Sequence, residues 1–345
     1  MMKEYLPIIG ITMGDPASIG PEISAKTFAN DNIYKICKPI LIGDAAVMEQ
    51  ATRIAGVNLK IRAVSRVSDA IFQSGIMDVF NLDNVNLSQL KMGEVSTMAG
   101  QAAFEAIEKV IELAQNKKVD ATVTGPIHKE AINKAGHHFS GHTEIYAHYT
   151  HTSKYAMLLV HESMRVIHVS THVSLREACD LVKKERILEV IQLLDRACKQ
   201  FGIKRPRIAV AGLNPHASDG GLFGLEEEKE ILPAVLEALK NGYHVEGPIP
   251  ADTLFTKAKG GVYDGCVAMY HDQGHIPFKL EGFTWDPASG KMKSVKGINI
   301  TVGLPIIRTS VDHGTAFEIA GKGIASPDAL QLAVEYAVTM AKNPQ

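Results

Sequence analysis

Three histidines each follow an apolar segment that is predicted to form a β-strand. In chain order they are His172, His216 and His271, and the strands are expected at residues 166–170, 208–211 and 266–270. Ligands of parallel α/β sheets bind at the carboxyl ends of the strands, so the three imidazoles are expected at one edge of a sheet. Together they would bind a divalent metal and leave one coordination position open, as catalytic metal sites do. Taken singly, each is more simply an ordinary loop or core histidine.

The histidines of this chain are also unevenly distributed. Nine of the 14 lie between His128 and His172. Because histidine binds metals and transfers protons near neutral pH, this region is a first candidate for chemistry. Downstream of it, Asp272 directly follows His271 and is placed to orient that imidazole or to add a ligand.

A second group of polar residues is suited to binding a phosphate or a carboxylate. Its members are His142, Thr143, Lys279, Asn299 and Arg308. Gly141 permits a tight backbone, and Thr143 would cap a helix and offer its amide and hydroxyl to an anion. The other three lie at or near predicted strand ends, where two cations and an amide suit an anion. The alternatives are a plain helix start and solvated surface groups.

The glycine-rich segments lack the usual nucleotide-binding patterns. Residues 214–224 have no Lys-Ser/Thr pair of a P-loop, and no G-x-G-x-x-G follows a predicted strand. A bound dinucleotide would therefore not use the usual Rossmann turn. The loop at residues 313–321 is the alternative, because its small residues would let a flat ring approach the backbone.

Apolar segments alternate with helical patterns along the chain, which predicts an α/β fold with a largely parallel sheet. Further strands are expected at residues 8–11, 39–43, 121–124, 155–160 and 298–302, and helices at 97–117, 187–201, 226–239 and from Gly20 and Ser326. A polar segment at 284–296 holds the only tryptophan and is expected to form an exposed hairpin or a lid.

Composition excludes several classes of protein. At roughly 150 residues per domain, 345 residues predict about two domains. A net charge of −2 gives no electrostatic footprint for nucleic acid, and 46% hydrophobic residues are typical of a globular chain. The four cysteines are widely spaced, which indicates reduced thiols rather than a disulfide or zinc framework. With no signal peptide or apolar span, the protein is expected to be soluble and cytoplasmic.

The motifs taken together resemble the 4-hydroxythreonine-4-phosphate dehydrogenase family over nearly the full length. The matching segments are Gly14-Asp15-Pro16, Gly20-Pro21-Glu22, Thr124-Gly125-Pro126 with Lys129, Gly141-His142-Thr143-Glu144, Thr171-His172, residues 212–217, Gly247-Pro248, residues 250–253, residues 270–274 and residues 308–315. The resemblance implies a fold like that of isopropylmalate and isocitrate dehydrogenases, with two α/β domains and a central cleft. One domain would comprise residues 1–130 and 300–345 and carry the NAD loop. The other, 131–299, would carry metal and substrate ligands and the interface of a homodimer.

The same resemblance assigns roles to individual residues. It implies a divalent metal (Zn, Mg, Mn or Co) on His172, His216 and His271, at a dimer interface that draws ligands from both chains. Substrate contacts carry over to His142, Thr143, Lys279, Asn299 and Arg308, with Lys279, Asp252 and Asp272 as candidates for proton transfer or ligand support. NAD would bind at His313, Gly314, Thr315 and Ala316.

The implied reaction is oxidation of the 3-hydroxyl of a four-carbon acid 4-phosphate by NAD, followed by decarboxylation. Two features depart from the vitamin B6 (pyridoxine) enzymes: His275-Ile276-Pro277 replaces a Leu-Pro pair, and the segment before Asn299 is longer. Both resemble the branch that acts on D-threonate or D-erythronate 4-phosphate, which would yield dihydroxyacetone phosphate and CO2. The alternatives are the pyridoxine-synthesis enzyme, an aromatic cis-dihydrodiol carboxylate dehydrogenase, and a non-catalytic phosphometabolite-binding protein.

Overall fold

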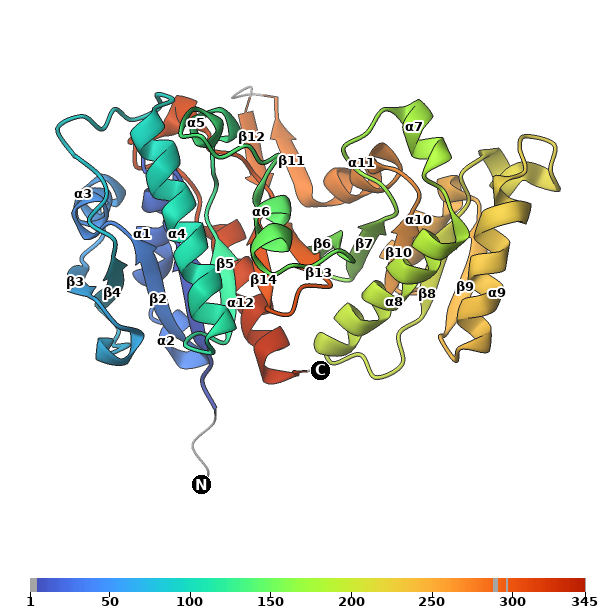
Figure 1. Cartoon of the computed structure of the whole chain (residues 1–345), viewed down its shortest axis with the longest axis horizontal. Coiled ribbons are helices and arrows are strands. Elements are labelled where there is room, and N and C mark those ends of the chain that lie inside the picture. The colour runs from blue at the N-terminus through green and yellow to red at the C-terminus, as the bar shows by residue number, and fades with distance from the viewer. Residues whose placement is uncertain (1–4, 288–290, 296, 345) are drawn as a thin grey trace. The chain divides into compact units, whose positions relative to one another are not determined.

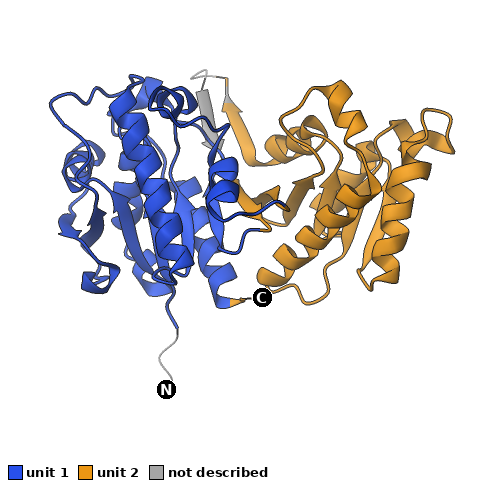
Figure 2. Ribbon diagram, in the orientation of Figure 1, with its two compact units in different colours: residues 1–153, 304–342 blue, residues 154–303, 343–345 orange. Residues whose placement is uncertain are grey.

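The computed structural model describes residues 5–287, 291–295 and 297–344. The chain forms two compact units, coloured separately in Figure 2. Unit 1 comprises residues 1–153 and 304–342, and unit 2 comprises residues 154–303 and 343–345. Both units combine helices with neighbouring strands, so the expected α/β class is confirmed. Within the described residues, no helix is long and apolar enough to cross a membrane.

Unit 1 is built on parallel strands in the order β3-β4-β2-β1-β5-β14 (Figure 1). The strands are β1 (Ile8–Thr12), β2 (Lys38–Gly43), β3 (Lys60–Val64), β4 (Ile76–Asn81), β5 (Ala121–Thr124) and β14 (Arg308–Val311). The helices are α1 (Gly20–Phe28), α2 (Ile33–Ile36), α3 (Ala45–Ala55), α4 (Thr97–Gln115), α5 (Lys129–Lys134), α6 (His142–Tyr149) and α12 (Asp328–Lys342), with the short turns η1 (Val67–Asp69) and η4 (Phe317–Ile319). The central strands β1 and β5 are almost entirely buried, as expected of parallel strands in an α/β sheet.

The boundary of unit 1 lies at residue 153 rather than at the expected 130. Ile132, Ile145 and Tyr146 are buried in the same apolar cluster as Phe104 and Ile107 of α4. The segment 131–153 therefore packs on α4. His142 and Thr143, expected in the second domain, belong to unit 1.

Unit 2 has the strand order β13-β6-β7-β10-β8-β9. The strands are β6 (Ala156–His161), β7 (Met164–His168), β8 (Ile208–Ala211), β9 (Val245–Ile249), β10 (Gly265–Ala268) and β13 (Ile298–Val302), and β11 (Phe283–Asp286) pairs separately with β12 (Lys291–Val295). The helices are α7 (Leu175–Asp180), α8 (Lys184–Gln200), α9 (Leu232–Lys240), α10 (Ala251–Lys259) and α11 (His271–Gly282), with the short segments η2 (Pro215–Asp219) and η3 (Glu227–Ile231). Residues 288–290 and 296 of the expected hairpin or lid lie outside the described residues.

The expectation of a largely parallel sheet holds in unit 1 but only in part of unit 2. There β6 runs antiparallel to both of its neighbours, β13 and β7, whereas β7, β10, β8 and β9 are parallel. Only Glu162 and Ser163 connect β6 to β7, and two residues are too few for the crossover that parallel strands need. Glu162 has a φ of 49°, as residues of tight hairpin turns do.

Candidate functional site

A pocket in unit 1 lies at the carboxyl ends of two neighbouring parallel strands, β5 and β14. It is lined by Thr124, Gly125, Pro126, Ile127, Lys129, Gly141, His142, Ser310, Val311 and His313. The strand order explains this gathering, because parallel strands side by side end at the same edge of a sheet. The pocket therefore brings the predicted substrate residue His142 to the predicted cofactor residue His313.

Arg308 begins β14, two residues before the pocket residue Ser310, and is 3% exposed. Its Nη2 donates to Thr124 Oγ1 at 2.9 Å, and its guanidinium lies 5.5 Å from the centre of the Tyr146 ring. Burial lowers the pKa of Arg308 to about 10, while Tyr146 and Glu144 act in the opposite direction. The guanidinium therefore stays charged at neutral pH and supplies fixed positive potential.

His142 is the first residue of α6, directly after Gly141. Its Nε2 is shielded from solvent and has no hydrogen-bond partner within the described residues. Burial, reinforced by the charge of Arg308, holds the pKa of His142 well below its usual value. A neutral imidazole has one donor and one acceptor nitrogen, so His142 suits a hydroxyl or a phosphate oxygen. Thr143 follows it in the first turn of α6 and does not cap the helix as expected, because the N-cap position is taken by Gly141.

Lys129 is a pocket residue that the site prediction missed. It begins α5, and its ammonium makes no hydrogen bond or ion pair with the described residues. None of the described residues that line the pocket carries a carboxylate. Lys129 in the lining, and the charge of buried Arg308 acting on His142, give the pocket a positive potential that favours an anion. The signal in the sequence was the Thr124-Gly125-Pro126 motif, which ends three residues before this lysine.

The predicted NAD loop begins at His313 and passes along unit 1. The Nδ1 of His313 lies 3.0 Å from the Gly314 carbonyl, and burial lowers the pKa of this imidazole. Ile19 N donates to the Thr315 carbonyl at 3.2 Å. Ala316 has a φ of 44°, and Phe317 after it stacks on His128 with ring centroids 4.8 Å apart. The backbone of this loop is therefore held from several sides.

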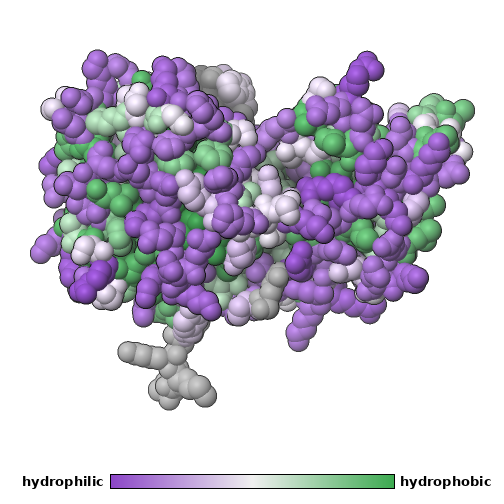
Figure 3. All heavy atoms as spheres, viewed as in Figure 1, coloured by the Kyte–Doolittle hydropathy of each residue, from purple (hydrophilic) through white to green (hydrophobic). Residues whose placement is uncertain are grey.

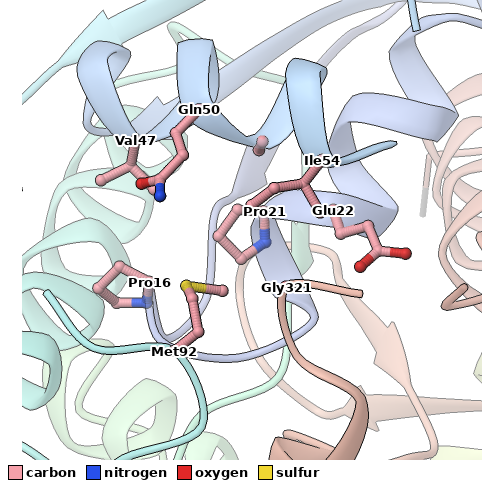
Figure 4. Close-up of a pocket in the computed structure, with 9 residues that line it drawn as sticks. Pro16, Pro21, Glu22, Val47, Gln50, Ile54, Met92 and Gly321 are labelled. Atoms are coloured by element: carbon pink, nitrogen blue, oxygen red, sulfur yellow. The ribbon is translucent and has the colours of Figure 1, made fainter. Parts of the chain in front are cut away.

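The continuation of this loop is fastened to α1. Glu22 is 2% exposed and accepts hydrogen bonds from Ala325 N at 2.7 Å and Gly323 N at 3.2 Å. Lys26 donates to Glu22 Oε1 at 2.9 Å and to the carbonyls of Gly323 and Ala325 at 2.9 and 2.6 Å. Figure 4 shows Glu22 beside Gly321, at a small and mostly apolar pocket formed with α3.

The three predicted metal ligands follow three adjacent parallel strands of unit 2. His172 follows β7, His271 begins α11 directly after β10, and His216 follows β8. The sequence argument from strand ends therefore placed all three at one edge. His172 and His271 line a shared pocket with ring centroids 6.0 Å apart, whereas His216 is not among its lining residues.

The surroundings of His271 select one of its nitrogens as a ligand. Asp272 Oδ1 lies 2.7 Å from Nδ1, which leaves Nε2 as the ring nitrogen that could bind a metal. His275 stacks on His271 with centroids 3.7 Å apart, and His168 lies behind it at 4.6 Å. Burial is the main cause that lowers the pKa of His168 to about 3 and that of His275 to about 4. Both buried imidazoles are therefore neutral.

The two imidazoles at this pocket are of a type that suits a divalent metal. Imidazoles are common ligands of zinc and of other divalent transition metals, and His172 with His271 offers two at one pocket. Among the described residues, no three His, Cys, Asp or Glu side chains converge closely enough to hold an ion. His216 belongs to η2 and is 66% exposed.

The remaining predicted residues all lie in unit 2. Lys279 is in the last turn of α11, with its ammonium 5.1 Å from the centre of the Phe283 ring. Asn299 is half-buried on β13, and Asp252 is exposed in the first turn of α10. Of the predicted substrate residues, His142 thus lines the pocket at the ends of β5 and β14 together with Lys129, and the guanidinium of Arg308 reaches Thr124 of the same pocket.

Comparison with known proteins gives a consistent result. The family model described as "Pyridoxal phosphate biosynthetic protein PdxA" matches residues 35–337. The D-threonate 4-phosphate dehydrogenase of Cupriavidus necator is 46% identical over 341 residues, which cover 99% of each chain. A 4-hydroxythreonine-4-phosphate dehydrogenase structure from Burkholderia phymatum is 43% identical, with a TM-score of 0.84 over 98% of this chain and 99% of that one. A terephthalate 1,2-cis-dihydrodiol dehydrogenase from Burkholderia xenovorans LB400 is 29% identical, with a TM-score of 0.68 over 97% and 98%.

Proposed function

Because the chain belongs to the family of the pyridoxal phosphate biosynthetic protein PdxA, whose members here are dehydrogenases, we propose that it oxidises D-threonate 4-phosphate or D-erythronate 4-phosphate. Oxidation at C3 gives a β-keto acid, which loses CO2 from C1 and takes a proton at C2 to yield dihydroxyacetone phosphate. The observation that carries the proposal is the pocket of unit 1, whose described lining has one cation, Lys129, and the histidines His142 and His313 but no acid.

In this proposal the pocket of unit 1 binds the anionic substrate. Arg308 supplies a buried positive charge. Its guanidinium is held in place by the hydrogen bond to Thr124 and by packing on the Tyr146 ring. His142 offers a neutral ring nitrogen, and Thr143 adds a hydroxyl at the start of the same helix. Charge-assisted hydrogen bonds of this kind are the strong contacts of phosphate sites.

Two groups from outside the chain complete the chemistry. We propose that His172, His216 and His271 hold a divalent metal (Zn, Mg, Mn or Co), and that the loop from His313 to Ala316 binds NAD. When bound, the metal acts as a Lewis acid toward the substrate hydroxyl and carboxylate, and NAD accepts the hydride. The chain's own part is to orient these groups, with Asp272 holding His271 in the tautomer that leaves Nε2 as ligand.

The proton that leaves the substrate hydroxyl and the proton that C2 takes up both need acid–base groups. We assign this task to Lys279, Asp252 and Asp272 of unit 2, with Asn299 as a further substrate contact. The ammonium of Lys279 lies over the Phe283 ring, and the residue is half-buried. Asp252 is exposed at the start of α10, where a proton can exchange with water.

A second copy of the chain is proposed as the partner. His216 is exposed and stands outside the pocket of His172 and His271, so the described residues of one chain do not gather all three proposed ligands. Leu222, Phe223 and Leu225 on the following loop are 72%, 48% and 44% exposed. Figure 3 shows hydrophobic residues gathered at the outer end of this loop, at the upper right of the view. Exposed apolar clusters of this kind are typical of interfaces, so we propose a homodimer through this region.

The alternative substrate is 4-hydroxy-L-threonine 4-phosphate, the B6 precursor. It differs from the sugar-acid phosphate at C2, where an amino group replaces a hydroxyl. The 43% identical structure favours keeping this alternative, whereas the cis-dihydrodiol dehydrogenase is less similar at 29%. The cytoplasm is the proposed compartment, since all four cysteines are free thiols.

The experiment measures NADH formation at 340 nm with four substrates: the D-threonate, D-erythronate and 4-hydroxy-L-threonine phosphates, and a cis-dihydrodiol carboxylate. We expect the largest kcat/KM with a sugar-acid phosphate, formation of dihydroxyacetone phosphate by mass spectrometry, and loss of turnover after metal chelation. Arg308→Met should raise KM at least tenfold, while the matched surface variant Lys35→Met should behave as wild type. A preference for the amino acid phosphate would transfer the assignment to the B6 reaction, and no turnover with any substrate would overturn it.

A further inference from the structure

The loop that carries His216 has an unusual backbone. All six residues from His216 to Gly221 have φ between 50° and 93°. Only the last two are glycines, and non-glycine residues rarely adopt this left-handed region because Cβ meets the carbonyl oxygen. Such a conformation persists only where the surroundings impose it, and it is concentrated at functional sites.

The buried carboxylate of Glu227 holds the residues that directly precede this loop. Glu227 on η3 is 4% exposed, and its Oε1 accepts from Leu213 N and Asn214 N at 2.7 Å each. Its Oε2 accepts from Asn214 Nδ2 at 2.8 Å. Three hydrogen bonds therefore fix the two residues from which the loop departs. Ala217 N continues this chain of contacts by donating to the Asn214 carbonyl at 3.1 Å.

Close packing fixes the loop from the other side. A Cβ at Gly212 would lie 2.9 Å from Ala217 Cα, so the loop folds back tightly on the end of β8. Ser218 is 2% exposed; its hydroxyl donates to the Gly224 carbonyl and accepts from Gly221 N at 3.0 Å. The backbone around His216 is thus held at both ends, while its imidazole projects outward and is 66% exposed.

The backbone of this loop is fixed while the imidazole of His216 is open to solvent, as expected of a side chain that is held ready to bind a metal. The described contacts of the His216 ring are an edge-on approach to Phe223, with centroids 6.4 Å apart, and Asp219 at 3.9 Å. Neither contact requires a left-handed main chain. A flexible loop would expose a histidine equally well. Its backbone would lose rotational freedom when a metal bound, however, and that entropic cost would weaken binding.

We propose that Glu227 is a positioning residue for metal binding: it holds His216 in the left-handed conformation, so that the imidazole is presented without a further entropic cost. The inference rests on the proposed role of His216 as a ligand. It identifies a residue outside the ligand set on which metal affinity depends. Partners that orient metal ligands typically change affinity 10- to 100-fold when they are replaced.

The first test is Glu227→Gln, which keeps the size of the side chain. One carboxylate oxygen becomes an amide NH2 that faces the NH2 of Asn214, so donor meets donor. Binding of Zn²⁺ to metal-stripped protein is measured by competition with a chromophoric chelator. We expect a loss of at least tenfold in affinity, with His216→Ala defining full loss of this ligand. Glu228→Gln, one residue away and exposed, is the matched control and should bind as wild type.

The second test removes the backbone strain of the loop and leaves the hydrogen bonds of Glu227 in place. Ala217 has a φ of 55° and a ψ of 48°, which glycine adopts freely. We expect Ala217→Gly to raise the Tm of the metal-free protein while lowering Zn²⁺ affinity, because the loop gains freedom. A higher Tm together with a lower Zn²⁺ affinity distinguishes a positioning role from a general loss of stability. This result can be obtained even if Glu227→Gln fails to fold.

The outcomes divide as follows. Weak binding by His216→Ala together with wild-type affinity in Glu227→Gln or in Ala217→Gly would overturn the inference and leave the proposed function intact. Equal affinity in wild type and His216→Ala would remove His216 from the ligand set, and both the metal assignment and the inference would fall. Loss of affinity in both loop variants, with the control unchanged, supports the inference.

Discussion

Glu22 fastens the segment after the loop that is proposed to bind NAD to α1, and the substitution Glu22→Gln tests this role. The Glu22 carboxylate accepts hydrogen bonds from Gly323 N, Ala325 N and the ammonium of Lys26. It thus connects two segments that lie about 300 residues apart in the sequence. Glutamine keeps one oxygen, which still accepts from Ala325 N. Its NH2 group faces Gly323 N–H, so two donors oppose each other, and the ammonium of Lys26 loses its counter-charge.

The expected cost follows from the burial of this pair. Glu22 is 2% exposed and Lys26 17% exposed, so solvent screens the loss weakly. An unpaired backbone N–H costs about 1–3 kcal/mol, and removing one partner of a buried ion pair costs about 3–5 kcal/mol in total. We therefore expect Glu22→Gln to destabilise unit 1 by about 3–5 kcal/mol. Adding Lys26→Met should recover part of this, because the unpaired cation is gone while the Gly323 amide still lacks its acceptor.

The assay must report on unit 1. The single tryptophan, Trp285, lies in unit 2, so its fluorescence is unsuitable. Hydrogen exchange of the peptide spanning residues 317–327, read by mass spectrometry, reports the amides of Gly323 and Ala325 directly. We expect their protection to fall in Glu22→Gln, together with a weaker Kd for NADH, since the same segment leads back to Thr315. Glu49→Gln, exposed on α3, is the control.

Unchanged exchange in this peptide, with a urea midpoint equal to that of the control, would refute the reasoning about the buried pair. Lost protection with unchanged NADH affinity would refute only the link from this segment to the cofactor.

Three further outcomes are expected. Desolvation raises the pKa of buried Asp15 from 3.8 to about 6, so its contribution to stability is full below pH 4 and is lost as pH rises through 6. Above pH 6, the free energy of unfolding of Asp15→Asn, measured in urea, should therefore exceed that of wild type by about 2–3 kcal/mol. At pH 4 the two values should be equal. Lys129→Met should raise KM for the phosphorylated substrate about tenfold, as expected for one charge-assisted bond, whereas Lys134→Met, whose lysine pairs with Glu130 on the same helix, should not; equal KM values would exclude Lys129 from the pocket's function. Gly274→Ala should destabilise by about 1–3 kcal/mol, because its Cβ would lie 2.3 Å from His168 Nε2, although alanine normally stabilises a helix; a gain in Tm would contradict this packing.

The sequence alone determined the class of fold and the chemistry at the strand ends. Strands 208–211 and 298–302 are observed at the expected residues, because short apolar runs between turn signals are a local property. The same reasoning placed His172, His216 and His271 after strands, and the structure shows these strands to be adjacent and parallel. Their role as metal ligands stays a prediction.

Only the tertiary structure decided which of these residues meet. Nothing local in the sequence says that Lys129 shares a pocket with His313, that segment 131–153 packs in unit 1, or that Glu22 holds Gly323. The antiparallel course of β6 and β7 and the left-handed loop at His216 were equally hidden. Periodicity reports which face of an element is buried, but it does not name the partner. Partners are chosen by the free energy of packing and hydrogen bonding summed over the whole chain, and that sum exists only in the folded structure.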